Sequence, residues 1–202
     1  MSRWWGMGSR MLVGLGATTF LAWIPTSAAA FEDTDRPWAA TVWAGWGTDG
    51  EIEDLPGITS NFEDTWIAGL SLAREFARTG EHFTWEFEAI AVRHFGWQRH
   101  WEGDLAVGLR WDGFSWPAEL HSSVAIATGV SYASRMPAME KAVNSDTMKW
   151  LQFMAVEIDF ARPERPDRAL VLRLHHRSSV WGLYGTEHGG SNFYALGLRK
   201  RF

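Results

Sequence analysis

Apolar and polar residues alternate along several stretches of the chain, most clearly between Arg99 and Asp112. Because successive side chains of a strand point to opposite faces, this stretch predicts a strand with one apolar and one polar face. Tryptophan at both ends of the apolar row is typical of a membrane-crossing strand, since aromatic rings settle at the two lipid–water interfaces. The apolar or small row comprises Trp101, Gly103, Leu105, Val107, Leu109 and Trp111, and the other comprises Glu102, Asp104, Ala106, Gly108, Arg110 and Asp112.

The same alternation recurs in seven further stretches, so the sequence predicts an all-β fold, an eight-stranded antiparallel transmembrane β-barrel. These stretches cover about 38–47, 64–77, 81–96, 119–133, 147–161, 168–180 and 191–202. Short turns of such barrels face the periplasm and long loops face outward. We therefore expect the connections 47–63, 133–147 and 180–190 outside the cell, with 96–100 as a short outer connection. The connections 78–80, 112–118 and 162–167 are expected in the periplasm.

Residues 1–30 have the features of a secretory signal peptide. They contain Arg3 and Arg10 but no acidic residue, then an apolar run from Met11 to Ile24 and a small-residue stretch ending at Ala30. We expect cleavage after Ala30 and export of residues 31–202 as one barrel domain. The remaining chain has no apolar run long enough for a spanning helix, so strands would make any membrane contact.

Charge and cysteine content narrow the classes of partner. The formal net charge is −5 at pH 7, and removing residues 1–30, with two arginines and no acid, would leave −7. This balance argues against nucleic acid as a partner, because nucleic-acid-binding proteins favour basic patches. The chain has no cysteine, so closure of the sheet must supply the stability. No metal or organic cofactor is implied.

The polar rows are expected to fill the barrel interior with paired charges. Eight strands enclose a lumen just wide enough for side chains to fill, which favours a buried network over an ion channel or a metal site. A soluble lipocalin-like barrel is the alternative, and it would instead turn the apolar rows inward. The residues expected inside are Glu86, Glu88, His94, Glu102, Asp104, Arg110, Glu119, His121, Glu157, Asp159 and Arg173.

One polar pair interrupts an apolar row. His176 and Ser178 continue the lipid-facing row of Leu170, Leu172 and Leu174 near the outer end of the seventh strand. An imidazole two residues from a hydroxyl on one strand face has the elements of a general base and a serine nucleophile. Such a pair needs a third group that orients the ring. Without catalysis, His176, Arg177 and Ser178 would be interfacial polar residues that contact lipopolysaccharide phosphates or pair across strands.

His176-Arg177-Ser178 resembles the His-x-Ser pair of the PagL-type lipid A 3-O-deacylases, which are eight-stranded outer-membrane barrels. The resemblance implies that this pair lies on the penultimate strand, faces the membrane and cleaves an acyl ester of lipid A. It also implies an acidic third residue further along the chain. The wider pattern, with Gly189-Gly190, Ser191 and a terminal Arg201-Phe202, is similar to a group of proteobacterial barrels.

The sequence departs from that family at two positions. Ser179 stands where the family has asparagine, and the position of the acid falls at Ser191 or Asn192. Asparagine also orients histidine in papain-like sites, so Asn192 is one candidate for the orienting group. Glu187, in the following loop, and Glu140, in the loop before the sixth strand, are the others.

The resulting expectation is a protein of the Gram-negative outer membrane. Its partners would be outer-membrane lipid or lipopolysaccharide and, through the terminal Phe202, the barrel assembly machinery. The enzymatic interpretation assigns Ser178 as nucleophile, His176 as base, and Asn192 or Glu187 as orienting group. The alternative is a non-enzymatic barrel that has a structural role or binds lipopolysaccharide.

Overall fold

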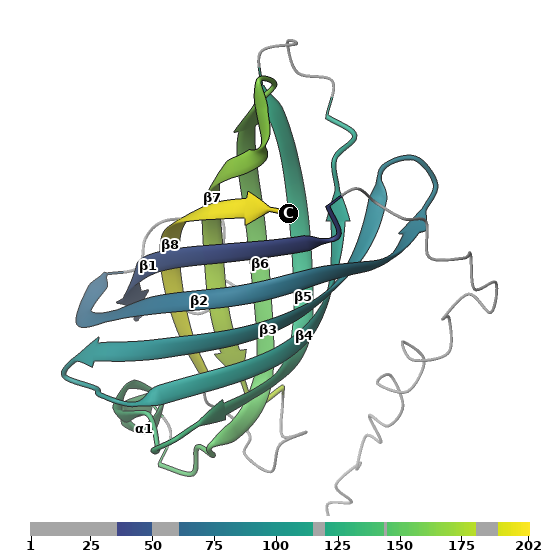
Figure 1. Ribbon diagram of the computed structural model, residues 1–202. Coiled ribbons are helices and arrows are strands. Elements are labelled where there is room, and N and C mark those ends of the chain that lie inside the picture. Colours follow the sequence, from purple (N-terminus) through teal and green to yellow (C-terminus); the bar gives the residue numbers. More distant parts are fainter. Residues whose placement is uncertain (1–35, 50–60, 115–119, 144, 181–189) are drawn as a thin grey trace, which may run out of the picture. The chain divides into compact units, whose positions relative to one another are not determined.

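The eight predicted strands form a closed barrel in the computed structural model, which describes residues 36–49, 61–114, 120–143, 145–180 and 190–202 (Figure 1). Every strand pairs antiparallel with its sequence neighbours, and β1 pairs with β8. The predicted fold class is confirmed, while the predicted signal peptide at 1–30 lies outside the described residues. The elements are β1 Trp38–Thr48, β2 Phe62–Thr79, β3 Phe83–Gly96, β4 Trp101–Trp111, β5 His121–Ala133, α1 Ala138–Val143, β6 Trp150–Arg162, β7 Arg165–Ser178 and β8 Gly190–Arg201.

Pairing of β1 with β8 removes the free edges of the sheet. The Trp38 N–H donates to the Phe202 carbonyl at 3.1 Å, and the Phe202 N–H donates to the Trp38 carbonyl at 2.8 Å. A closed sheet satisfies backbone donors and acceptors internally, as a lipid environment requires. The last residue of the chain therefore takes part in closing the barrel.

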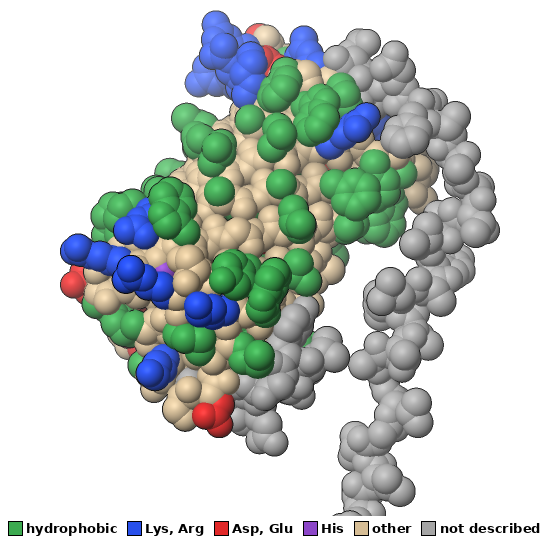
Figure 2. Space-filling view, turned by 60° about the horizontal axis from the view of Figure 1, so that its bottom comes forward, with side chains coloured by type: hydrophobic (Ala, Val, Ile, Leu, Met, Phe, Trp, Pro, Cys, Tyr) green, Lys and Arg blue, Asp and Glu red, His purple; other side chains and the backbone are tan. Residues whose placement is uncertain are grey.

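The apolar rows lie on the outside of the barrel. Leu105 is 64% exposed and Leu198 is 63% exposed, whereas Glu102 and Asp104 on the opposite face of β4 are each 3% exposed. Figure 2 shows hydrophobic side chains distributed over the wall of the barrel. This distribution contradicts the lipocalin-like alternative and is the one that a lipid-facing barrel requires.

The two ends of the barrel differ. The terminal end carries Arg36, Phe202 and the β2–β3 and β6–β7 turns, and the α1 end carries the β3–β4 connection and α1 (Figure 1). Within α1, Met139 is 7% exposed and Glu140 is fully buried, so this short helix covers the interior at its end. No helix among the described residues is long and apolar enough to span a membrane.

A tryptophan and a glycine fit together inside the barrel. Trp43 is 4% exposed, and a Cβ on Gly69 would lie 2.2 Å from its indole ring, so only glycine leaves room for it there. The Arg173 guanidinium lies 4.6 Å from the centre of the Trp43 ring. Aromatic and charged side chains together thus fill the lumen.

The predicted inward set is confirmed with two exceptions. His121 has the inward parity, but it is exposed at the start of β5, where the barrel wall begins. Glu119 lies outside the described residues. The other nine residues of that set are all buried.

Candidate functional site

His176 and Asn192 meet on the outer face of the barrel near the α1 end. They are cross-strand partners in the β7–β8 pair, and His176 Nδ1 lies 2.6 Å from Asn192 Oδ1. Because an amide oxygen only accepts, Nδ1 carries the proton and donates it, which leaves the lone pair on Nε2. Of the three residues considered for orienting His176, Asn192 is the one that the structure places in hydrogen-bond contact with its ring.

Ser178 follows on the same face of β7 and is partly buried. The described residues show no hydrogen bond between its hydroxyl and His176, so the two side chains share a row without direct contact of that kind. Its cross-strand partner on β6 is Gln152, whose Nε2 donates to Thr128 Oγ1 at 2.9 Å. Gln152 thus adds an amide donor beside the predicted pair.

The sequence analysis did not select Gln152, although a signal for it was present. Gln152 interrupts an outward row that otherwise contains Met148, Trp150, Met154, Val156, Ile158 and Phe160. A polar residue in a lipid-facing row is the same feature that singled out His176. Its relation to Ser178 appears only once the strands are paired in register.

Glu187 and Glu140 were the two acidic candidates for the group that orients His176. Glu187 lies outside the described residues. Glu140 is wrong for this role, because it lies inside the barrel, where its carboxylate accepts from Ser191 Oγ and Thr147 Oγ1 at 3.1 Å each. The helix α1 turns this side chain away from the outer face that carries His176.

The terminal half of the interior holds a group that we call the arginine cluster: Glu86, Glu88, Arg110, Glu157, Asp159, Arg173 and Arg199. Arg110 binds both oxygens of Glu86, at 3.0 and 3.1 Å, and also contacts Glu157 and Asp159. Arg173 binds both oxygens of Glu88, at 2.9 and 3.1 Å. Beside Arg110 the lumen leaves a cavity of only about 10 Å³, as expected for an interior filled by paired side chains.

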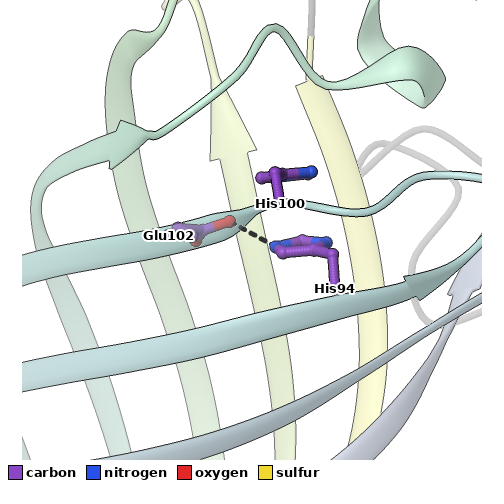
Figure 3. A group of neighbouring side chains, drawn as sticks. All are labelled: His94, His100 and Glu102. Carbon is purple, nitrogen blue, oxygen red and sulfur yellow. Dashed lines mark hydrogen bonds and ion pairs between the residues drawn. The ribbon is translucent and has the colours of Figure 1, made fainter.

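The α1 half of the interior holds a second group, the histidine cluster: His94, His100, Glu102, Asp104, Glu140, His175 and Arg177. Glu102 lies at its centre, with His94 Nε2 at 2.7 Å from one carboxylate oxygen (Figure 3). His175 Nε2 lies 2.7 Å from the other oxygen. Gln98 donates to His94 Nδ1 at 3.3 Å, so His94 carries its proton on Nε2 and donates it to Glu102.

Two members of the histidine cluster outside the strands have shifted pKa values. Burial, with the neighbouring His94, lowers the pKa of the His100 imidazole to about 3. Burial raises the pKa of the Glu140 carboxyl, against the opposing attraction of Arg177. Two groups in this cluster have the residue types and proximity to hold a metal ion: His94, His100 and Glu102 (Figure 3), and Glu102, Asp104 and His175.

Arg177 belongs to this cluster and not to the outer face. The sequence analysis grouped it with His176 and Ser178 as an interfacial lipid contact, yet its side chain is fully buried and lies 3.5 Å from Glu102 and 3.4 Å from Glu140. Strand parity alone contained the signal, because residues 173, 175 and 177 share the inward face.

Comparison with solved structures adds to these observations. The crystal structure of the outer membrane enzyme PagL matches with a TM-score of 0.58 at 12% identity, over 81% of this chain and 99% of that chain. The chain has the fold of an outer-membrane barrel. The crystal structure of Neisserial surface protein A matches with a TM-score of 0.49 at 8% identity, over 82% of this chain and 96% of that one. No protein-family model and no curated protein matches the sequence.

Proposed function

We propose that this protein is an outer-membrane acyl-ester hydrolase that acts on lipid A. The observation that carries the proposal is the His176–Asn192 hydrogen bond on the outer face of the barrel, where most rows are apolar. A neutral histidine with an oriented ring is what a serine nucleophile needs as its base, and Ser178 lies two residues further along the same row. The similarity in fold to the outer membrane enzyme PagL agrees with this assignment.

The proposed roles follow from the chemistry of ester cleavage. His176 Nε2 takes the hydroxyl proton as Ser178 Oγ attacks the ester carbonyl, and it returns that proton to the leaving alkoxide. The acyl group, then bound to Ser178, is released by a water molecule that His176 deprotonates in the same way. Gln152 supplies an amide donor beside Ser178 for the oxyanion.

The location follows from the faces of the barrel. Its apolar exterior suits the bilayer, and the longer connections at the α1 end suit the cell exterior. His176 then lies at the level of the outer leaflet, where lipopolysaccharide carries its acyl chains. We accordingly propose the outer membrane of a Gram-negative bacterium as its site, lipopolysaccharide as its partner, and the barrel assembly machinery as the route of insertion.

The competing function is a non-enzymatic barrel that binds lipopolysaccharide or has a structural role. It is favoured by the absence, among the described residues, of both a Ser178–His176 hydrogen bond and a carboxylate at His176. In that case the polar row of His176, Ser178 and Asn192 would contact lipid head groups only.

Incubation of the detergent-extracted protein with purified lipid A separates the two functions. The wild type should release a hydroxy fatty acid, and Ser178→Ala and His176→Ala should each abolish the release. When catalytic residues act as one unit, replacing one of them lowers the activity about as much as replacing both. Ser122→Ala is the matched control, since Ser122 lies on an outward row at the terminal end of β5. Release that persists in Ser178→Ala, or none from a folded wild type, would contradict the proposal. Heat-modifiable migration in gels verifies the fold of every variant.

A further inference from the structure

The two ion clusters inside the barrel differ in their charge balance. In the arginine cluster, the four carboxylates of Glu86, Glu88, Glu157 and Asp159 face three arginines, and Arg201 at the rim supplies a fourth positive charge within 3.8 Å of Glu86. Each of these carboxylates has a guanidinium within 3.1 Å. Every carboxylate of this cluster is thus paired with a guanidinium.

The histidine cluster lacks that balance. Its three carboxylates, on Glu102, Asp104 and Glu140, face Arg177 as the one arginine among the described residues of the cluster. Arg177 is a weak partner for them, because its Nε and Nη1 atoms are buried and make no hydrogen bond to any described residue. With all three carboxylates ionised and the histidines neutral, negative charge exceeds positive charge in this half of the lumen.

Asp104 is the carboxylate of the histidine cluster with the least compensating positive charge. Its side chain is buried beside the Ser131 hydroxyl and the Glu102 carboxylate, and neither of its oxygens makes a hydrogen bond of good geometry to a described residue. The nearest basic atom is His175 Nε2, 4.0 Å from Oδ2. Burial of an unpaired carboxylate is costly, and proteins avoid the cost by protonating the group, by pairing the charge or by coordinating a metal with it.

We propose that Glu102, Asp104 and His175 together bind one divalent transition-metal ion inside the barrel. One ligand atom from each of these residues lies within 4.8 Å of the others, close enough to meet around one ion after small side-chain rotations. Two carboxylates and an imidazole suit Zn²⁺ and its neighbours in the first row. The ion brings two positive charges to the half of the lumen that lacks them and gives Asp104 a partner.

The surroundings of the site support the same ligand set. His94 donates to the other oxygen of Glu102, which is the usual way in which a second residue orients a metal-binding carboxylate. Ion binding would require His175 to move its proton from Nε2, which lies 2.7 Å from Glu102, to Nδ1, which has no acceptor among the described residues. Figure 3 shows His94 and Glu102 meeting from the neighbouring strands β3 and β4.

The neighbouring group of His94, His100 and Glu102 fits a shared ion less well. The rings of His94 and His100 are stacked, with centres 3.9 Å apart and planes inclined by only 15°. Nitrogen lone pairs lie in the plane of the ring, so stacked rings do not direct them at a common point. His100 is therefore a matched control for His175: both are buried histidines of the same cluster.

Metal content after refolding tests the site. The full protein is refolded from urea into detergent with Zn²⁺, freed of loose metal by gel filtration, and measured by elemental mass spectrometry, alongside protein extracted directly from membranes. We expect one Zn²⁺ per refolded wild-type chain and at least a tenfold loss of affinity in Asp104→Asn and in His175→Gln. The control variants His100→Gln and His82→Gln, the latter in an exposed histidine, should retain the ion.

A second measurement applies even where a variant refolds poorly. Zn²⁺ should raise the urea midpoint of the wild type, because an ion that binds only the folded state stabilises it, and Ca²⁺ should not. The same increment should be absent in folded Asp104→Asn. A wild type that holds no Zn²⁺ and gains no stability from it would overturn the proposal. Loss of the ion in His100→Gln with retention in Asp104→Asn would also overturn it.

Discussion

The Nδ1 atom of His176 lies 2.6 Å from Oδ1 of Asn192, across the pairing of β7 with β8 and on the outside of the barrel. The side chains are respectively 6% and 7% exposed, so this bond is sheltered, as is the adjacent Leu174, whereas Leu172 and Leu196 further along the two strands are exposed. A neutral amide here fixes the tautomer of the imidazole as a carboxylate would, but it stabilises the imidazolium less. The proposed hydrolase would therefore have a base whose third member is weaker than a carboxylate.

Replacement of Asn192 should change the rate of hydrolysis in two directions. Asn192→Ala removes the acceptor of the His176 proton and should lower kcat, whereas Asn192→Asp should raise it because a carboxylate stabilises the imidazolium. Release of fatty acid from lipid A by each purified variant measures the effect. Equal rates in the wild type and Asn192→Ala would show that this hydrogen bond does not serve catalysis.

A charge on the outer wall should destabilise the barrel in the membrane. Val107 is 37% exposed in the middle of β4 and is expected to face lipid. Val107→Arg should cost about 2–4 kcal/mol at the midplane of the bilayer. Urea unfolding in lipid vesicles measures this, with Met136→Arg in the exposed β5–β6 connection as the control that should cost little. Equal costs for the two variants would refute the assignment of the lipid-facing row.

Loss of the last residue should impair assembly. Phe202 closes the barrel through two backbone hydrogen bonds to Trp38, and its ring is exposed on the outer face. Deletion of Phe202 should reduce the amount of heat-modifiable protein in the membrane without changing synthesis or export. Normal amounts of assembled protein would show that insertion needs neither the hydrogen bonds between Phe202 and Trp38 nor the aromatic side chain of Phe202.

Removing an arginine from the arginine cluster should destabilise the barrel, and removing one of its carboxylate partners as well should restore part of the stability. Arg110→Met leaves three buried carboxylates short of a partner and should cost about 3–5 kcal/mol. Adding Glu86→Gln removes one of those charges and should restore part of the loss. Arg168→Met is the matched control, because Arg168 pairs with Asp167 at an exposed site and should cost at most about 1 kcal/mol. A double variant less stable than Arg110→Met would contradict this account of the cluster.

The alternation of apolar and polar residues predicted most of this fold. In a barrel with an apolar exterior and a polar interior, alternate residues of each strand face the outside and the lumen. The pairings depend on register, which parity does not contain. Asn192 had the correct outward parity, but its place opposite His176 follows from the β7–β8 register alone. Glu140 was misplaced for a different reason: a six-residue helix in a loop turns the side chain into the lumen.

The division of the interior charges into a balanced and an unbalanced cluster could not be predicted from the sequence either. The expected network of carboxylates, arginines and histidines is present, but its division into two clusters depends on the stagger of all eight strands. Arg199, for example, lies far along the chain from Glu157 and Asp159 and still contacts both. Such contacts across the lumen cannot be read from alternation within one strand.

Mass spectrometry of lipid A from cells that express this protein tests the central claim most directly. We predict that lipid A from cells with the wild type lacks one hydroxyacyl chain, whereas lipid A from cells with Ser178→Ala, inserted at the same level and heat-modifiable, keeps its full set. Unchanged lipid A in the presence of folded, inserted wild-type protein would contradict the enzymatic function and leave His176, Ser178 and Asn192 as an interfacial lipid contact.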